Sequence, residues 1–148
     1  MRVALATDHA GFPLKARIAQ WLTDNGHEVV DFGVDSDAVP VDYPDYVAPA
    51  ARAVAAGDCE RGIVLGGSGT GEAIVANKIH GIRAVEAADP VTARLGREHN
   101  DANVLVLPAR LLTDAEGREI LKTWLDTPFE GGRHERRVEK IEVEPEKK

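Results

Sequence analysis

Cysteine and aromatic residues are scarce in this chain. Its 148 residues include a single cysteine, Cys59, and only 5% of them are aromatic. One cysteine excludes an internal disulfide and is typical of a reducing compartment. Cys59 lies in a polar stretch with no adjacent basic residue to activate its thiol, so we expect it to have no chemical role. A secretory leader pattern is also missing, because Asp8 follows the first short apolar run, and we expect a cytoplasmic protein.

Long hydrophobic runs and metal-ligand spacings are absent as well. No apolar run approaches the roughly 20 residues that span a membrane, so we expect no membrane contact. The formal net charge of −7 disfavours binding to nucleic acid. No spacing of histidine, cysteine and carboxylate residues matches a zinc or iron site, and we expect neither a metal nor another cofactor.

The length and composition are those of an ordinary globular protein. Hydrophobic residues make up 43% of the chain and charged residues 29%. We therefore expect one domain over residues 1–148 with a well-formed core. Within it, residues 129–148 form a highly charged C-terminal tail that is helical at least in part.

Strand-like and helix-like patterns alternate along the chain. Strands are expected at residues 2–7, 27–32, 62–65, 82–87 and 103–107. Helices are expected at residues 12–25, 46–56, 71–78, 90–98 and 113–125, with Thr113 as the last N-cap. This alternation predicts an α/β fold: a doubly wound, Rossmann-like or flavodoxin-like, five-stranded parallel sheet with helices on both faces and a C-terminal helical tail.

The stretch from Gly66 to Glu72 reads Gly-Gly-Ser-Gly-Thr-Gly-Glu and follows the apolar strand at 62–65 directly. A strand, a glycine loop and a helix in this order aim free backbone N–H groups at an anion. The loop lacks the Gly-Lys-Ser/Thr ending of nucleotide-triphosphate loops and matches the dinucleotide fingerprint poorly. Because a carboxylate repels phosphate, Glu72 suggests a base that takes up a proton. The simpler interpretation is a plain turn with a glutamate favoured by the helix dipole.

Other polar residues accompany the predicted strands. Asp8 and His9 follow the first strand, Arg110 follows the fifth, and His99 and Asn100 end the helix before the fifth. Ligands of such sheets bind outside the carboxyl ends of the strands, so we expect these residues to share one edge with the glycine loop. Two simpler interpretations remain open: Asp8 and His9 as a helix N-cap pair, and His99 as a partner of the helix dipole.

Five motifs together resemble one enzyme family. They are Asp8-His9-Ala10-Gly11, Asp42-Tyr43-Pro44, the glycine loop continued to Ala76-Asn77-Lys78, Arg97-Glu98-His99-Asn100-Asp101-Ala102-Asn103, and Gly132-Arg133-His134-Glu135-Arg136-Arg137. In this order they resemble the type B ribose-5-phosphate isomerases, a family that includes galactose-6-phosphate isomerase subunits. Many members have a catalytic cysteine where this chain has Gly66. The chain therefore resembles the branch in which the glutamate, here Glu72, is the base.

The resemblance implies an aldose–ketose isomerase that interconverts ribose 5-phosphate and ribulose 5-phosphate through a cis-enediolate, without a metal. Glu72 would move the proton, and His99 would open the sugar ring with Asp8 close by. Donors to the developing oxyanion would be the Ser68 hydroxyl and the backbone N–H groups of Gly67, Ser68, Gly69, Thr70 and Gly71. The phosphate would be bound by Arg110, Arg133 and Arg137, aided by His9 and by His134 as a further candidate. Tyr43 and Asn100 would hydrogen-bond the sugar hydroxyls.

The charged tail also predicts self-association. It has too many charges to pack internally, which favours a homodimer or a tetramer, and in the resembling family His99, Asn100 and Arg110 reach into the site of the neighbouring subunit. Two alternative functions remain open. One is an isomerase of allose, galactose or erythrulose phosphate. The other is a non-catalytic phosphate-binding module of flavodoxin-like architecture, which has no need for Glu72 or His99.

Overall fold

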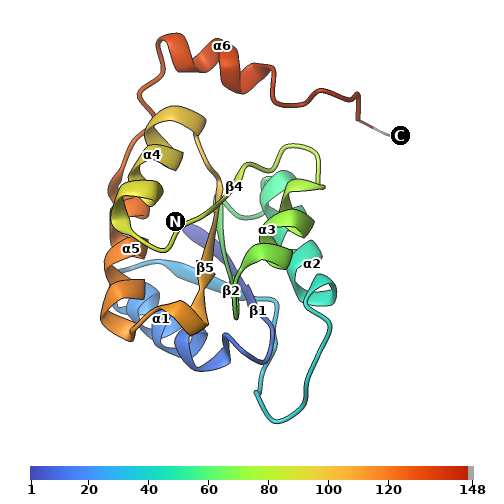
Figure 1. Cartoon of the computed structure of the whole chain (residues 1–148), viewed down its shortest axis with the longest axis vertical. Coiled ribbons are helices and arrows are strands. Elements are labelled where there is room, and N and C mark those ends of the chain that lie inside the picture. The colour runs from blue at the N-terminus through green and yellow to red at the C-terminus, as the bar shows by residue number, and fades with distance from the viewer. Residues whose placement is uncertain (147–148) are drawn as a thin grey trace.

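The computed structural model describes residues 1–146 and contains a five-stranded sheet with helices on both faces (Figure 1). The strands are β1 (Arg2–Thr7), β2 (Glu28–Asp31), β3 (Arg61–Gly66), β4 (Ala84–Glu86) and β5 (Val104–Pro108). The helices are α1 (Phe12–Asp24), α2 (Pro44–Ala55), α3 (Thr70–Asn77), α4 (Pro90–Asn100), the 3₁₀ turn η1 (Ala109–Leu111), α5 (Asp114–Asp126) and α6 (Arg133–Glu139).

The strands are all parallel and lie in the order β2-β1-β3-β5-β4. The predicted doubly wound parallel sheet is confirmed. The order departs from the flavodoxin-like 2-1-3-4-5 arrangement because β5 lies between β3 and β4, which leaves β4 at the edge. The winding direction reverses between β1 and β3, and such a switch point creates a crevice at the carboxyl ends of the two strands.

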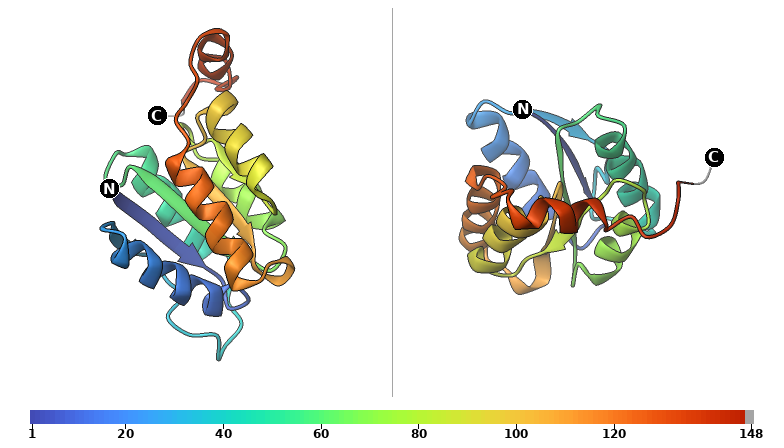
Figure 2. Two further views of the ribbon diagram at one scale, coloured as in Figure 1. Left: turned by 90° about the vertical axis from the view of Figure 1, so that its left-hand side faces the viewer. Right: turned by 90° about the horizontal axis from the view of Figure 1, so that it is seen from above.

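Side chains of the central strands alternate between two hydrophobic clusters. Val3 and Leu5 pack with residues of α1, α4 and α5, whereas Ala4 and Ala6 pack with residues of α2 and α3. Figure 2 shows these helices as layers on either side of the sheet. Because both faces are covered, the central strands consist of nearly continuous apolar runs, as parallel sheets require.

The observed element boundaries lie within two residues of those expected. Thr113 is the N-cap of α5: its hydroxyl accepts from the N–H of Glu116 at 3.1 Å, and the Glu116 carboxylate accepts from the N–H of Thr113 at 3.0 Å. The charged tail contains α6, so its partial helicity is confirmed. The single-domain division with a tail from residue 129 stays a prediction. No helix in the described residues has the length and apolarity needed to span a membrane.

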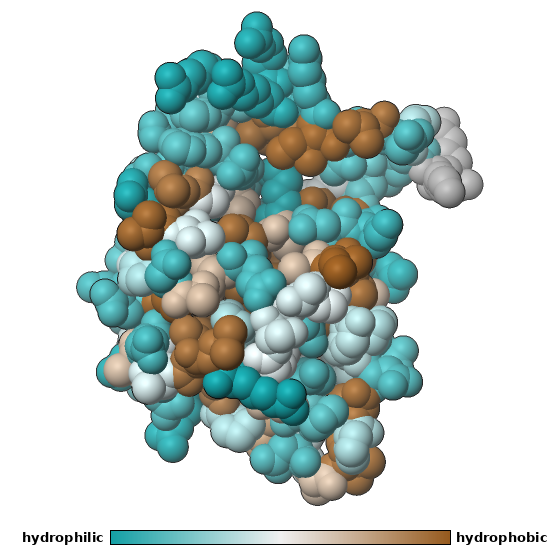
Figure 3. Space-filling model, viewed as in Figure 1, coloured by the Kyte–Doolittle hydropathy of each residue, from teal (hydrophilic) through white to brown (hydrophobic). Residues whose placement is uncertain are grey.

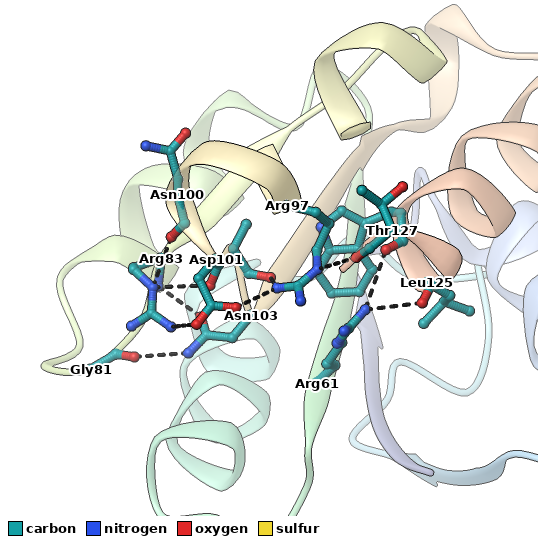
Figure 4. A network of polar contacts seen from close by, with 11 residues as sticks. Arg61, Gly81, Arg83, Arg97, Asn100, Asp101, Asn103, Leu125 and Thr127 are labelled. Carbon is teal, nitrogen blue, oxygen red and sulfur yellow. Dashed lines mark hydrogen bonds and ion pairs between the residues drawn. The ribbon is translucent and has the colours of Figure 1, made fainter. Parts of the chain in front are cut away.

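A buried arginine holds the end of α4 in place (Figure 4). Arg97 is 6% exposed, and its Nη1 donates to the Asp101 carboxylate and to the carbonyl of Ala102, both at 2.8 Å. Its Nε donates to the carbonyl of Thr127 at 3.1 Å, just after α5. One guanidinium therefore joins the end of α4 to the segment that leads into the C-terminal tail.

A second arginine braces the same corner from the side of β4. The Arg83 Nε donates to the carbonyls of Asn100 and Asp101 at 3.1 and 3.0 Å. Asn103 completes the arrangement, because its amide accepts from the N–H of Arg83 and donates to the carbonyl of Gly81. The turn after α4 is thus fixed by hydrogen bonds rather than by apolar packing.

Replacing Arg97 should destabilise the protein strongly. In Arg97→Met, the carbonyls of Ala102 and Thr127 lose a donor and Asp101 loses one of its two arginine partners, so we expect the free energy of unfolding to fall by about 3 kcal/mol. Arg94→Met is the matched control on the same helix. It removes a more exposed pair with Glu98 and should lose no more than about 0.5 kcal/mol. Urea unfolding of the two variants checks this, and equal losses would contradict it.

Candidate active site

The switch point between β1 and β3 opens into a polar cavity of about 400 Å³. Asp8 follows β1 directly, and the glycine loop follows β3. The cavity is lined by Asp8, His9, Ala10, Tyr43, Gly67, Ser68, Gly71, Glu72 and Arg110. Eight of these nine residues, all except Ala10, were candidate site residues from the sequence, and the cavity brings them together at the carboxyl edge of the sheet.

The glycine loop passes from β3 into α3 through a left-handed residue. Gly69 has a φ of 79°, a conformation that L side chains rarely adopt, and α3 begins at the next residue, Thr70. No side chain caps α3 by a hydrogen bond, and the Thr70 N–H is 3.4 Å from the Ser68 Oγ. The first turn of α3 therefore presents N–H groups and a positive helix end beside the cavity, as anion binding requires.

Glu72 lies in this first turn and is only 4% exposed. Its carboxylate packs over the α-carbon of Gly66, where even a β-carbon would overlap it. Burial raises the pKa of Glu72, a backbone hydrogen bond opposes this, and the charges of Asp8 and Glu86 raise the pKa further. A partly desolvated carboxylate at the cavity wall is suited to taking up a proton.

Asp8 and His9 are held by the loops around them. One carboxylate oxygen of Asp8 accepts from the N–H groups of Ala10 and Gly11 at 2.9 and 3.2 Å, while Gly11 is the N-cap of α1. The Nδ1 of His9 accepts from the N–H of Val41 at 3.2 Å, so the Nε2 carries the proton. Asp8 thus shapes the turn before α1 without being its N-cap.

Tyr43 and Arg110 complete the wall of the cavity. The Tyr43 ring lies against Gly71, and the Arg110 guanidinium lies over Gly67, with its Cζ 3.1 Å from the site of a β-carbon there. Arg110 makes no ion pair among the residues that the structure describes. A guanidinium without a carboxylate partner, next to free N–H groups, favours binding of an anion.

Glu86 is a functional candidate that sequence reasoning missed. It ends β4, and its carboxylate comes within 3.0 Å of the position that a β-carbon of Gly69 would occupy. Desolvation raises the pKa of Glu86. In the sequence, Glu86 is only a lone carboxylate at the end of an otherwise apolar strand. That pattern indicates a functional residue only once the structure shows β4 behind the glycine loop.

Four candidates, His99, Asn100, Arg133 and Arg137, lie elsewhere, and the positions of His99 and Asn100 correct the expectation of one shared edge. Helix α4 starts after the carboxyl end of β4 and runs back, so His99 and Asn100 at its end lie at the amino ends of the strands. Arg133 and Arg137 of α6 lie at the same end, which Figure 1 shows opposite the loop after β2. Arg110, expected to reach a neighbouring subunit, lines the cavity of its own chain.

His99 has partners of its own at this far end. Its ring stacks on that of His134, with centroids 4.3 Å apart, and its Nε2 is 3.7 Å from the Glu130 carboxylate. Desolvation lowers the pKa of His134, and the positive charges of His99 and Arg133 act in the same direction. His99 therefore belongs to a second polar cluster and is not only a partner of the helix dipole.

A groove between α1 and α5 is an alternative location for a ligand. It measures about 320 Å³ and is lined mainly by the apolar side chains or stems of Leu14, Ile18, Trp21, Leu121 and Arg118. Among the described residues that line it, the one carboxylate, Asp114, is exposed, and no glycine is present. Its chemistry is that of a packing surface, so the cavity at the switch point remains the candidate active site.

Comparison with known proteins agrees with this arrangement. The family model described as ribose/galactose isomerase matches residues 3–141. Ribose-5-phosphate isomerase B of Escherichia coli is 44% identical over 140 residues, which are 95% of this chain and 93% of the relative. D-erythrulose-4-phosphate isomerase of Pectobacterium atrosepticum is 39% identical over 141 residues, covering 95% and 93% of the two chains.

Comparison with solved structures gives similar proteins from the same family. The crystal structure of a ribose 5-phosphate isomerase from Thermotoga maritima has a TM-score of 0.93 and 45% sequence identity, and the match covers 96% of this chain and 97% of that one. The resemblance drawn from five motifs is confirmed by similarity over nearly the whole length. The chain belongs to the ribose/galactose isomerase family.

Proposed function

We propose that this protein interconverts ribose 5-phosphate and ribulose 5-phosphate, with Glu72 as the base. The observation that carries the proposal is a buried carboxylate of raised pKa in the first turn of α3, in a cavity that also holds Arg110. In a simple anion cradle, a carboxylate there would weaken binding because it repels the anion. Its relative from Escherichia coli is named ribose-5-phosphate isomerase B, which supports the choice of substrate.

In the proposed reaction Glu72 removes the proton from C2 of the open-chain aldose, and the negative charge moves to the C1 oxygen, which gives a cis-enediolate. The proton of the C2 hydroxyl then passes to the C1 oxygen, protonated Glu72 returns its proton to C1, and the carbonyl forms at C2, so no electrons leave the substrate. Ser68 and the loop N–H groups would stabilise the negative oxygen. Once protonated, Glu72 no longer repels that oxygen, which makes burial of the carboxylate useful rather than harmful.

We further propose that two copies of the chain share each site. His99, Asn100, Arg133 and Arg137 lie too far round the sheet to serve the cavity of their own chain. A two-fold axis across the edge strand β4, perpendicular to the strands, would bring this end of one copy to the cavity of the other. His99 would then open the sugar ring, and the two arginines would join Arg110 and His9 on the phosphate.

The surface around β4 supports this pairing. Ile74 on α3 and Val91 and Leu95 on α4 are 57%, 55% and 36% exposed, and these helices pack on opposite faces of the sheet beside β4. Figure 3 shows hydrophobic groups spread over this face of the molecule. Exposed apolar side chains next to an unprotected strand edge are typical of an interface.

A second candidate substrate is a shorter or longer sugar phosphate. The relative named D-erythrulose-4-phosphate isomerase is 39% identical, and the loop at the cavity mouth carries Val39 with 66% of its surface exposed. We propose that this loop limits the length of sugar that the site accepts. The length of the sugar chain that the enzyme prefers therefore has to be measured.

Kinetics with a panel of sugar phosphates test the proposed function. We expect kcat/KM to be highest for ribose 5-phosphate, compared with erythrulose 4-phosphate, allose 6-phosphate and galactose 6-phosphate. A higher value for a tetrose or hexose phosphate would assign the enzyme to that substrate instead. In D₂O, absence of deuterium at C1 or C2 of every substrate would identify a non-catalytic phosphate-binding protein.

Glu72→Gln should remove catalysis while leaving the fold intact. The amide keeps the shape of the side chain but not its basicity, so kcat should fall by at least about 10²-fold with KM little changed. Because the folded state raises the pKa of Glu72, ionised Glu72 lowers stability above that pKa, and the neutral amide should melt no lower than wild type at neutral pH. Turnover near that of wild type would make Asp8 the next candidate base.

The pH profile should report Glu72 and its neighbour Glu86. Only the ionised base is active, so kcat/KM should fall as the pH drops through the raised pKa of Glu72. Glu86→Gln removes a negative charge that raises this pKa, and the acidic limb should move to lower pH. Glu60→Gln, an exposed change before the amino end of β3, is the control. An acidic limb that stays in place in Glu86→Gln would separate Glu86 from Glu72.

Mixing two inactive variants tests the shared sites. Heterodimers of Glu72→Gln with His99→Ala contain one site with both residues intact. Random subunit exchange should therefore restore about a quarter of wild-type activity. Verified heterodimers without activity would show that each chain builds its site alone.

A further inference from the structure

Three metal-ligating side chains meet at the far end of the molecule, away from the cavity. They are His99 at the end of α4, Glu130 in the connection after α5, and His134 in α6. One ligand atom from each lies within 4.8 Å of the other two, and the His99 Nε2 is 3.7 Å from the Glu130 Oε1. Spacing along the sequence did not reveal this group, because His99 is brought to the other two by the fold.

We propose that His99, Glu130 and His134 bind a zinc-like divalent cation, and that this cation inhibits the isomerase. Two imidazoles and one carboxylate form the ligand set of many three-residue zinc sites, with a fourth position left for water. The same set accepts Co²⁺, Ni²⁺ and Cu²⁺ but is poorly suited to Mg²⁺ or Ca²⁺, which prefer oxygen ligands. The inhibitory part of the proposal rests on the proposed function, whereas the binding part does not.

The three side chains need only small movements to close on a cation. Metal–ligand bonds of about 2.0–2.2 Å in a tetrahedron place donor atoms about 3.3–3.6 Å apart, so the most widely separated ligand atoms must approach by roughly 1 Å. The imidazoles must also turn out of their stack, because parallel rings do not point their nitrogens at one atom. The side chains of His99 and Glu130 are 39% and 48% exposed and can turn, while His134 is buried and supplies the fixed ligand.

The backbone around the cluster is already held together. The N–H of Glu130 donates to the carbonyl of Glu98 at 3.1 Å, which pins the ligand-bearing connection to the last turn of α4. Arg97 ties the same two segments through the carbonyl of Thr127. Two of the three ligands are therefore kept near each other before any cation arrives, which lowers the entropy lost on binding.

The surrounding charges limit the affinity. Arg133 and Arg137 lie close enough to influence the pKa of His134, and their positive charge opposes a cation. Both guanidiniums are exposed and screened by water, and Glu130 supplies a negative charge directly on the cation. We therefore expect a reversible site, weaker than a structural zinc site with four protein ligands.

Inhibition follows from the role proposed for His99. An imidazole nitrogen bound to a metal neither accepts nor donates a proton, so a cation at this cluster would stop ring opening in the neighbouring subunit. The isomerisation itself would need no metal. EDTA should consequently leave the metal-free enzyme as active as before and restore the activity of zinc-treated enzyme.

Calorimetric titration of the metal-free full-length protein with ZnCl₂ tests the site. We expect one Zn²⁺ per chain, with the dissociation constant raised at least about tenfold in Glu130→Gln and in His99→Ala. Glu142→Gln is the matched control. It breaks the exposed pair of His80 with Glu142 and leaves all three proposed ligands unchanged. Co²⁺ in place of Zn²⁺ should give visible absorption that Glu130→Gln weakens. Equal zinc binding in Glu130→Gln and wild type would overturn the proposal.

Activity with and without ZnCl₂ tests the inhibition. At saturating Zn²⁺ wild type should lose at least about 10²-fold in rate, the loss expected for an acid–base group, and regain it with EDTA. Glu130→Gln should keep its rate at zinc concentrations that inhibit wild type. Zinc binding without inhibition, in an enzyme that isomerises ribose 5-phosphate, would overturn the inhibitory role alone. Failure of the metal-free enzyme to act on any sugar phosphate would instead overturn the proposed function and leave the binding result standing.

Discussion

The candidate site depends on one close contact, that of the Glu72 carboxylate with the backbone of Gly66. The carboxylate reaches the end of β3 only because no side chain occupies position 66. There it is shielded from water, and this burial is the main reason that its pKa is raised. A β-carbon at position 66 would overlap the carboxylate, so Glu72 can occupy this place only because residue 66 is glycine.

The sheet topology then decides what can surround that contact. The switch point between β1 and β3 creates the crevice, and β5 on the other side of β3 leads into η1, which carries Arg110. Because β5 is an inner strand, β4 is left as a short edge strand flanked by α3 and α4. The same topology sends the end of α4 to the opposite end of the sheet. Four candidate residues, His99, Asn100, Arg133 and Arg137, therefore lie at the opposite end of the sheet from the cavity, and the proposed assembly of two copies would unite the two groups.

The far end is held by polar interactions of a different kind. Arg97, Arg83 and Asn103 saturate the carbonyls around the end of α4, and the connection after α5 is bound to the same corner. This rigid corner supports His99 on one side and the segment leading to His134 on the other. Catalysis in a neighbouring subunit and cation binding would therefore use the same preorganised backbone, and one would exclude the other.

Much of this protein was determined by local sequence patterns. Apolar runs of strand length, helical periodicity and the Thr113 capping box specify the elements and their order, because burial of a strand or a helix face imposes its period on the adjacent residues. The glycine loop with Glu72 was predicted for the same reason, since a strand, a tight turn and a helix start are all local features. The five motifs were sufficient to indicate the family.

Tertiary structure alone decided which of these features meet. The exchange of β4 and β5 in the sheet, the separation of His99 from Glu72, the approach of Glu86 to Gly69 and the meeting of His99 with Glu130 and His134 leave no local trace. Each depends on the direction in which a helix runs after its strand and on which strands become neighbours. Those choices are made by the packing of the whole sheet, so residue type and spacing identify the candidates, and only the fold determines the distances between them.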